Sequence, residues 1–183
     1  YRTTLCMRRR FGDCKDKASL IKVMLEAAGV ETNLVLIRTR RLGAVAQEPP
    51  SLSIFNHAIA YVPEFDLFLD GTAEFNGSEE LPFGDQGQFC LVVADGGKVT
   101  PRMTPVQTPD LNKFLRILEV DLSGPTALVK GELRAEGNNA PYYRRTFENA
   151  EERKEALARS LARSYPGARL VDAEFVEISD LEK

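Results

Sequence analysis

The longest regular pattern of apolar residues in the chain lies just after its N-terminal segment. Four of these residues recur at spacings of three and four, which places them on one face of a helix. They are Ala18, Ile21, Leu25 and Ala28. Asp13 stands where an N-cap is expected, Asp16 follows as an acidic third residue, and Gly29 suits the C-terminal stop. The pattern therefore predicts a capped helix that begins near residue 14, and residues 3–10 are expected to end an earlier helix.

The next segments have the shorter apolar runs that are typical of strands. Residues 33–40 predict one strand, and residues 41–51 predict a loop. Residues 55–63 and 66–73 predict two strands joined by a tight turn. Residues 89–101 predict a hairpin with its turn at the Asp-Gly-Gly sequence. The first half of the chain therefore combines helix and strand.

The pattern changes after residues 100–110, which hold three prolines and predict a linker or crossing segment. Residues 114–122 and 126–137 alternate apolar and polar positions, as half-buried antiparallel strands do. A helix at about residues 149–164, ended by Pro166 and Gly167, and a last strand at residues 168–178 complete the prediction. We expect an α+β fold in two domains, residues 1–105 and residues 106–183, the second β-rich with one helix.

Composition and charge narrow the classes of function. The chain is 43% hydrophobic and 28% charged, as ordinary globular proteins are. It has no apolar run long enough to span a membrane, so we expect no membrane insertion. The net charge of −3 argues against nucleic acid as a partner. Because the sequence starts at Tyr1, we expect it to be part of a longer protein.

Three cysteines stand far apart, without the spacing of a disulfide framework or a zinc site. Cys6 and Cys90 are expected to be small buried hydrophobic residues. Cys14 lies in the first turn of the predicted helix, where unpaired amides and the positive end of the helix dipole favour a thiolate. By itself, this position fits a buried structural cysteine as well as a nucleophile.

The chain has one histidine, His57, at the start of a predicted strand. A cysteine nucleophile needs a base, and His57 has no competitor for that role. Asp70 ends the next predicted strand, where it would lie opposite His57 and could orient the imidazole. The alternative is that Asp70 only belongs to a turn that ends the strand. We interpret Asp85 and Asp95 as turn residues and expect no metal site.

Three segments together resemble a known family. They are GDCKDKASLIKVMLEAAGVETNLVLIRT, FNHAIAYV and FLDGTAEF. They are similar to the transglutaminase-like core of bacterial multidomain proteins, and the resemblance covers about residues 1–105. It implies a papain-like core in which a helix bearing Cys14 packs on an antiparallel sheet bearing His57 and Asp70. It also implies that a β-rich domain precedes the core and that the location is periplasmic or in the cell envelope. The sequence departs from the family at one point, because the helical part that usually precedes the cysteine helix is nearly absent.

The activity implied by this resemblance is cysteine-dependent acyl chemistry on peptide or protein amides, without a cofactor. The chain would be a hydrolase or an acyltransferase, and the sequence does not decide between water and an amine as acceptor. The alternative function is a binding or scaffolding module that keeps the fold with little turnover. A peptide-binding surface on the edges of the C-terminal strands is a third hypothesis.

Overall fold

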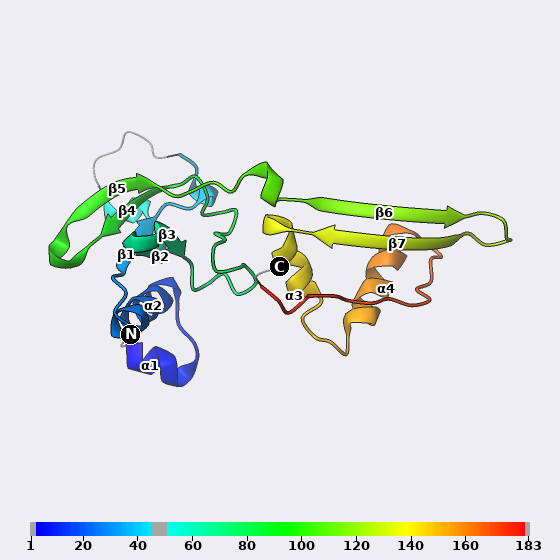
Figure 1. The fold of residues 1–183 in the computed structure, drawn as a ribbon, viewed down its shortest axis with the longest axis horizontal. Coiled ribbons are helices and arrows are strands. Elements are labelled where there is room, and N and C mark those ends of the chain that lie inside the picture. The colour runs from blue at the N-terminus through cyan, green and yellow to red at the C-terminus, as the bar shows by residue number, and fades with distance from the viewer. Residues whose placement is uncertain (1–2, 45–50, 182–183) are drawn as a thin grey trace. The chain divides into compact units, whose positions relative to one another are not determined.

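The structure, a computed structural model, describes residues 3–44 and 51–181 and has a mixed α and β fold (Figure 1). The chain divides into two compact units. The first unit comprises Tyr1–Glu74 and Ser78–Gln107, and the second comprises Phe75–Gly77 and Thr108–Lys183. Each unit holds one antiparallel sheet.

Two helices open the first unit, α1 (Thr3–Arg9) and α2 (Cys14–Ala27). Asp13 caps α2, because its side chain accepts hydrogen bonds from the backbone N–H groups of Lys15 and Asp16. The Asp16 carboxylate in turn accepts from the Asp13 N–H at 3.2 Å, which completes a capping box. Beyond the helix, Gly29 has a φ of +85°, a conformation that glycine adopts without strain. The predicted caps of this helix are confirmed.

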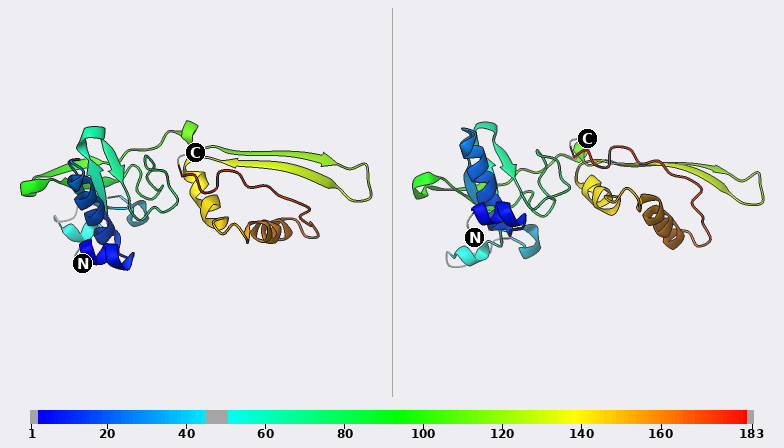
Figure 2. Two further views of the ribbon diagram at one scale, coloured as in Figure 1. Left: turned by 60° about the horizontal axis from the view of Figure 1, so that its bottom comes forward. Right: turned by 90° about the horizontal axis from the view of Figure 1, so that it is seen from below.

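Five strands form the sheet of the first unit, in the order β3-β2-β1-β4-β5. Their bounds are β1 Asn33–Ile37, β2 His57–Val62, β3 Leu67–Leu69, β4 Phe89–Val93 and β5 Val99–Met103. Neighbouring strands are antiparallel throughout. Helix α2 contacts β2 and β1 and lies along the sheet in each view (Figure 2).

Two predictions for this unit need correction or restriction. Strand β5 continues to Met103, so it occupies part of residues 100–110, which were predicted to be a linker. Pro101 is compatible with this strand because β5 lies at the edge of the sheet. The predicted loop at residues 41–51 falls largely on residues 45–50, which lie outside the described residues.

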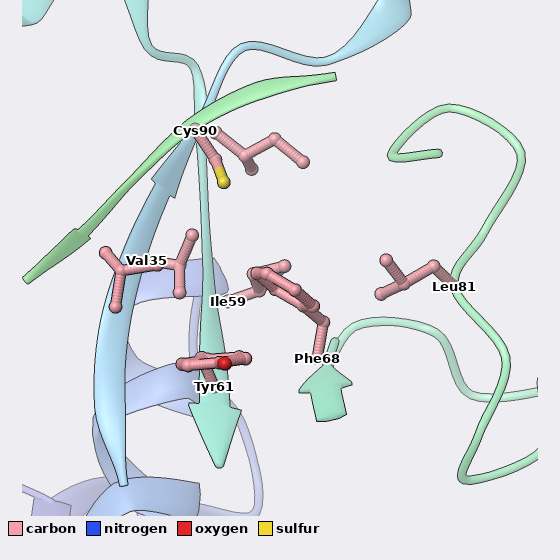
Figure 3. Close-up of a cluster of buried hydrophobic side chains, with 8 residues drawn as sticks. Val35, Ile59, Tyr61, Phe68, Leu81 and Cys90 are labelled. Atoms are coloured by element: carbon pink, nitrogen blue, oxygen red, sulfur yellow. The ribbon is translucent and has the colours of Figure 1, made fainter. Parts of the chain in front are cut away.

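The core of the first unit follows from the strand register. Val35 pairs with Ile59 on one side and with Val92 on the other, so these three side chains share a face of the sheet. The whole cluster comprises Val35, Ile37, Ile59, Tyr61, Phe68, Leu81, Cys90 and Val92. Leu81 reaches it from the segment between β3 and β4 (Figure 3). This segment is therefore tied to the core at one point.

The second unit contains a two-stranded ribbon, β6 (Phe114–Asp121) and β7 (Leu128–Ala135), and two helices, α3 (Ala140–Thr146) and α4 (Arg153–Ser164). The two strands are antiparallel, as predicted. They are not half-buried, however, because every residue of β6 is exposed and β7 is exposed except at Ala135, which is intermediate. A two-stranded ribbon has two faces, and alternation in the sequence does not say which of them is covered.

Three further predictions for the second unit differ from the structure. Helix α4 begins at Arg153 rather than near residue 149, and α3 is a second helix in a domain for which the sequence predicts one. Residues 168–178 form no strand. Instead, the Phe175 ring packs on Phe147 with centroids 5.0 Å apart, and Asp172 pairs with Lys154. This segment therefore contacts its own unit through side chains, without strand pairing.

None of the helices in the described part of the chain combines the length and apolar character that a membrane crossing requires.

Candidate active site

The Gly-Asp-Cys sequence places Cys14 at the first position of α2. Gly12 permits a close approach there, because a Cβ atom on it would lie 2.7 Å from Cys6 Sγ and 2.7 Å from Asp16 Cβ. Asp13 then supplies the cap, and Cys14 follows at the positive end of the helix. Cys6 is buried, whereas Cys14 is partly accessible. Each residue of the motif therefore has a structural reason for its place.

His57 is the first residue of β2 and pairs with Ile37 of β1. The preceding residue, Asn56, fixes the start of this strand. Its backbone N–H donates to Ile37 O at 3.2 Å, its side-chain oxygen accepts from the Thr39 N–H at 2.9 Å, and its amide donates to Thr39 Oγ1 at 2.8 Å. Asn56 therefore anchors the backbone beside His57, and its side chain is engaged by Thr39.

Asp70 follows β3 and belongs to a tight Asp-Gly-Thr turn. Its Oδ1 accepts from the Thr72 N–H and the Thr72 hydroxyl, both at 2.8 Å, while its Oδ2 lies 3.1 Å from His57 Nε2. A Cβ atom on Gly71 would lie 2.9 Å from Ile21 Cδ1 and 3.1 Å from Lys17 Cβ, so glycine lets this turn pack on α2 without displacing these side chains. Asp70 therefore belongs to a turn and also makes a hydrogen bond with His57.

The structure brings Cys14, His57 and Asp70 together. The Cys14 side chain lies close enough to the His57 imidazole to contribute to its raised pKa. Because Nε2 is directed to Asp70, Nδ1 is the ring nitrogen available to the sulfur. The imidazole therefore lies between the cysteine at the start of α2 and the carboxylate after β3. This is the arrangement of a cysteine nucleophile, a histidine that carries its proton and a carboxylate that orients the histidine.

The electrostatics of this arrangement favour a charged imidazole. Burial alone would lower the pKa of His57, but the hydrogen bond and the charge of Asp70, together with Cys14 and Asp85, raise this pKa to about 9. Burial likewise opposes ionisation of Asp70, but the hydrogen bonds from His57 and Thr72 outweigh it and lower the pKa of Asp70. At neutral pH the site therefore holds an imidazolium beside an ionised Asp70.

A fourth group, Asp85, was interpreted from the sequence as a turn residue. Its backbone does form a turn, since the Asp85 N–H donates to Pro82 O at 2.8 Å. Its side chain, however, is only 6% exposed, and its Oδ2 lies 3.6 Å from His57 Nε2. Burial raises the pKa of Asp85, and the neighbouring Asp70 carboxylate raises it further, whereas the positive charge of His57 lowers it. The resulting pKa of Asp85 is about 7. The local sequence gives no signal of this, because the fold alone buries the residue.

His57, Asp70 and Asp85 also form a set of donors that could hold a divalent cation. One ligand atom from each lies within 4.8 Å of the others, and nitrogen with carboxylate oxygen suits zinc and similar metals. The same proximity follows from the hydrogen bond between Asp70 and His57 and from the 3.6 Å approach of Asp85 Oδ2 to the same ring nitrogen. We therefore treat the three groups as a cluster of interacting side chains.

Comparisons with known proteins found no family model, no curated protein and no solved structure that matches this chain. The functional assignment therefore rests on the residues and geometry of the site itself.

Proposed function

We propose that this chain is a transglutaminase-like cysteine enzyme with a papain-like core, in which Cys14 attacks the carbonyl carbon of a peptide or protein amide. The observation that carries the proposal is the position of His57, which makes a hydrogen bond with Asp70 at 3.1 Å and has its pKa raised in part by the Cys14 side chain. The family resemblance of the surrounding sequence supports the same assignment.

In the first half-reaction, the Cys14 thiolate forms a bond to the carbonyl carbon, and the electron pair of the C=O bond moves to the oxygen. Asp13 takes the N–H groups of Lys15 and Asp16, so the Cys14 N–H is the first-turn donor that remains for this oxyanion. When the C–N bond breaks, the His57 imidazolium gives its proton to the departing amine. The product is a thioester on Cys14 and a neutral imidazole.

In the second half-reaction, water or an amine attacks the thioester carbon and gives its proton to His57. The Cys14 sulfur leaves as a thiolate, and the starting charges are restored. Water yields hydrolysis and an amine yields acyl transfer, so the acceptor that reaches the thioester decides the reaction class. Asp70 stays ionised throughout and keeps the imidazole directed toward Cys14.

An activated ester tests this proposal without knowledge of the natural substrate. We expect p-nitrophenyl acetate to release nitrophenol in a burst and to leave one acetyl group on Cys14, located by peptide mass spectrometry. Cys6 and Cys90 are buried and serve as internal controls for general thiol reactivity. Acetylation spread evenly over all three cysteines, or unchanged in His57→Ala, would contradict the proposal.

If a stable acetyl group forms, adding a primary amine such as glycine amide distinguishes the two reaction classes. Faster loss of the acetyl group with acetylated amine as product indicates transfer, whereas an unchanged rate with acetate as product indicates hydrolysis.

A further inference from the structure

The proposed mechanism makes no use of the Asp85 carboxyl. This group is nevertheless buried beside His57, which carries the proton, and Asp70, which orients the imidazole. The segment that bears it is fixed from several sides. Thr104 donates its hydroxyl hydrogen to Asp85 O, Gln86 Nε2 donates to Leu81 O at 2.7 Å, and the Gln107 N–H donates to Gln86 Oε1 at 3.0 Å. The fold therefore holds Asp85 in a defined place, unlike the side chain of a solvated turn.

The Asp85 and Asp70 side chains are both buried, and each places its Oδ2 against His57 Nε2, at 3.6 Å and 3.1 Å. The three groups lie within 4.8 Å of one another, and a hydrogen bond between the two carboxyl groups needs one proton, since two carboxylates only accept. Asp70 already accepts from His57 and from two donors of Thr72, and these bonds stabilise its charged form. The proton therefore belongs to Asp85, which acts as the donor.

We propose that Asp85 is a positioning residue: its protonated carboxyl donates a hydrogen bond to Asp70 and so holds that carboxylate against His57 Nε2. Its effect on turnover rests on the proposed function, but the hydrogen bond itself does not. When Asp85 loses its proton, this bond is lost, and a second negative charge lies 3.6 Å from the imidazolium. His57 then holds its proton more tightly and gives it up to the leaving amine less readily.

The charged and titratable groups around Asp85 come from each element packed there. They are Cys14 from α2, His57 from β2 and Asp70 after β3. Two nearby cations are engaged elsewhere. Lys17 pairs with Glu74 at 3.3 Å, and the Arg40 guanidinium donates to the carbonyls of Phe83 and Gln86. The ionisation of Asp85 is therefore transmitted to His57 directly and through Asp70.

The experiment compares Asp85→Asn, which keeps a neutral donor, with Asp85→Ala, which removes it. Asp95→Asn is the matched control, because Asp95 is a turn aspartate in the same unit with a side chain 86% exposed. The first readout is the NMR titration of the imidazole, which is unambiguous because the chain has one histidine. We expect the wild-type imidazole signals to show an inflection near pH 7 that Asp85→Asn abolishes, with the His57 pKa about 1 pH unit lower.

The second readout is acetylation of Cys14 by p-nitrophenyl acetate across pH. At pH 6 we expect Asp85→Ala to slow it about tenfold with little change in KM, and Asp85→Asn to recover at least about half of the wild-type rate. An NMR inflection near pH 7 that persists in Asp85→Asn overturns the proposal. So does an equal loss of rate in both variants. If Cys14 is not acetylated in the wild type but the inflection vanishes in Asp85→Asn, the positioning bond stands and the proposed enzymatic function fails.

Discussion

The two units place antiparallel strands in opposite surroundings. In the first unit, the apolar runs of β1 and β2 lie in a closed core, and Val35 and Ile59 are 0% exposed. In the second unit, alternating apolar residues of β6 and β7 remain accessible, and Ile117 is 53% exposed. Alternation sets which residues share a face, but only the surrounding elements determine whether that face is covered.

This difference explains where the candidate chemistry lies. His57 stands at the start of a strand whose following five residues are all buried, so its side chain is only 14% exposed. A desolvated, fixed environment strengthens the interaction of its imidazole with Asp70. The exposed ribbon of the second unit offers no such environment. We therefore expect changes in the first unit to affect both chemistry and stability, and changes in the ribbon to affect neither strongly.

The largest expected difference between the units is in acyl chemistry. Cys14→Ser should lower the rate of p-nitrophenol release by about 10³-fold or more, because a hydroxyl beside His57 is a far poorer nucleophile than a thiolate. Ile117→Ala, in the ribbon, should leave the rate unchanged. Stopped-flow absorbance measures both. An equal loss of rate in Cys14→Ser and Ile117→Ala would contradict the assignment of the chemistry to the first unit.

Core stability should show the next largest difference. Ile59→Ala should lower the free energy of unfolding by about 2–5 kcal/mol, because it leaves a cavity among packed side chains. Ile117→Ala removes the same atoms from an exposed position and should cost less than about 1 kcal/mol. Urea denaturation followed by circular dichroism measures each value. A similar cost at both positions would mean that the ribbon is covered in solution.

The pH dependence of the free energy of unfolding should show a smaller effect, whose direction follows from the pKa shifts. Asp85 has a pKa of 3.8 when unperturbed and about 7 in the fold, so between these values the native state binds more protons than the unfolded state. The free energy of unfolding therefore falls as pH rises from about 4 to 7. His57 acts in the same direction between 6.5 and about 9. Asp70, whose pKa is lowered, contributes stability above 3.8 that is lost only on further acidification.

Asp85→Asn should remove the fall in the free energy of unfolding that Asp85 causes between about pH 4 and pH 7. Relative to wild type, this variant should be more stable at pH 8 by about 1–3 kcal/mol, because an amide carries no buried charge. Below pH 4 the advantage should vanish, since the wild-type carboxyl is then neutral in both states. Urea titrations at several pH values measure the difference. A constant difference between pH 4 and pH 8 would contradict a titrating Asp85.

The smallest effect is expected at an exposed ion pair of the second unit. Lys154 and Asp172 lie 2.6 Å apart, but their side chains are 63% and 78% exposed. Solvent screens such a pair, so Lys154→Ala should produce no measurable change in the free energy of unfolding. The same urea titration measures it. A clear loss would show that this pair holds residues 168–178 in place.

The sequence was informative where local chemistry determines position. Asp13 and Gly29 mark the ends of α2 because capping is a property of a few neighbouring residues. The strand pattern around residues 55–73 predicts two paired strands, and their pairing brings the Asp70 side chain to His57 through one short turn. Asp85 shows the limit, because nothing in its neighbours separates it from Asp95. Asp85 is buried because Leu81 joins the core and the hydrogen bonds of Gln86 and Thr104 fix the adjoining segment, whereas Asp95 is exposed.

Gly71 has a consequence for the robustness of the site. It lets the turn that carries Asp70 touch the side of α2, the helix that begins at Cys14, so these two parts keep their spacing by van der Waals contact. Such a contact has no charge, and neither salt nor a change of pH weakens it. The spacing between Asp70 and the start of α2 is thus set by a contact that does not depend on the protonation of His57, Asp70 or Asp85. A larger residue at position 71 would push the Asp70 turn away from α2 and so separate Asp70 from Cys14, although no ionisable group would be removed.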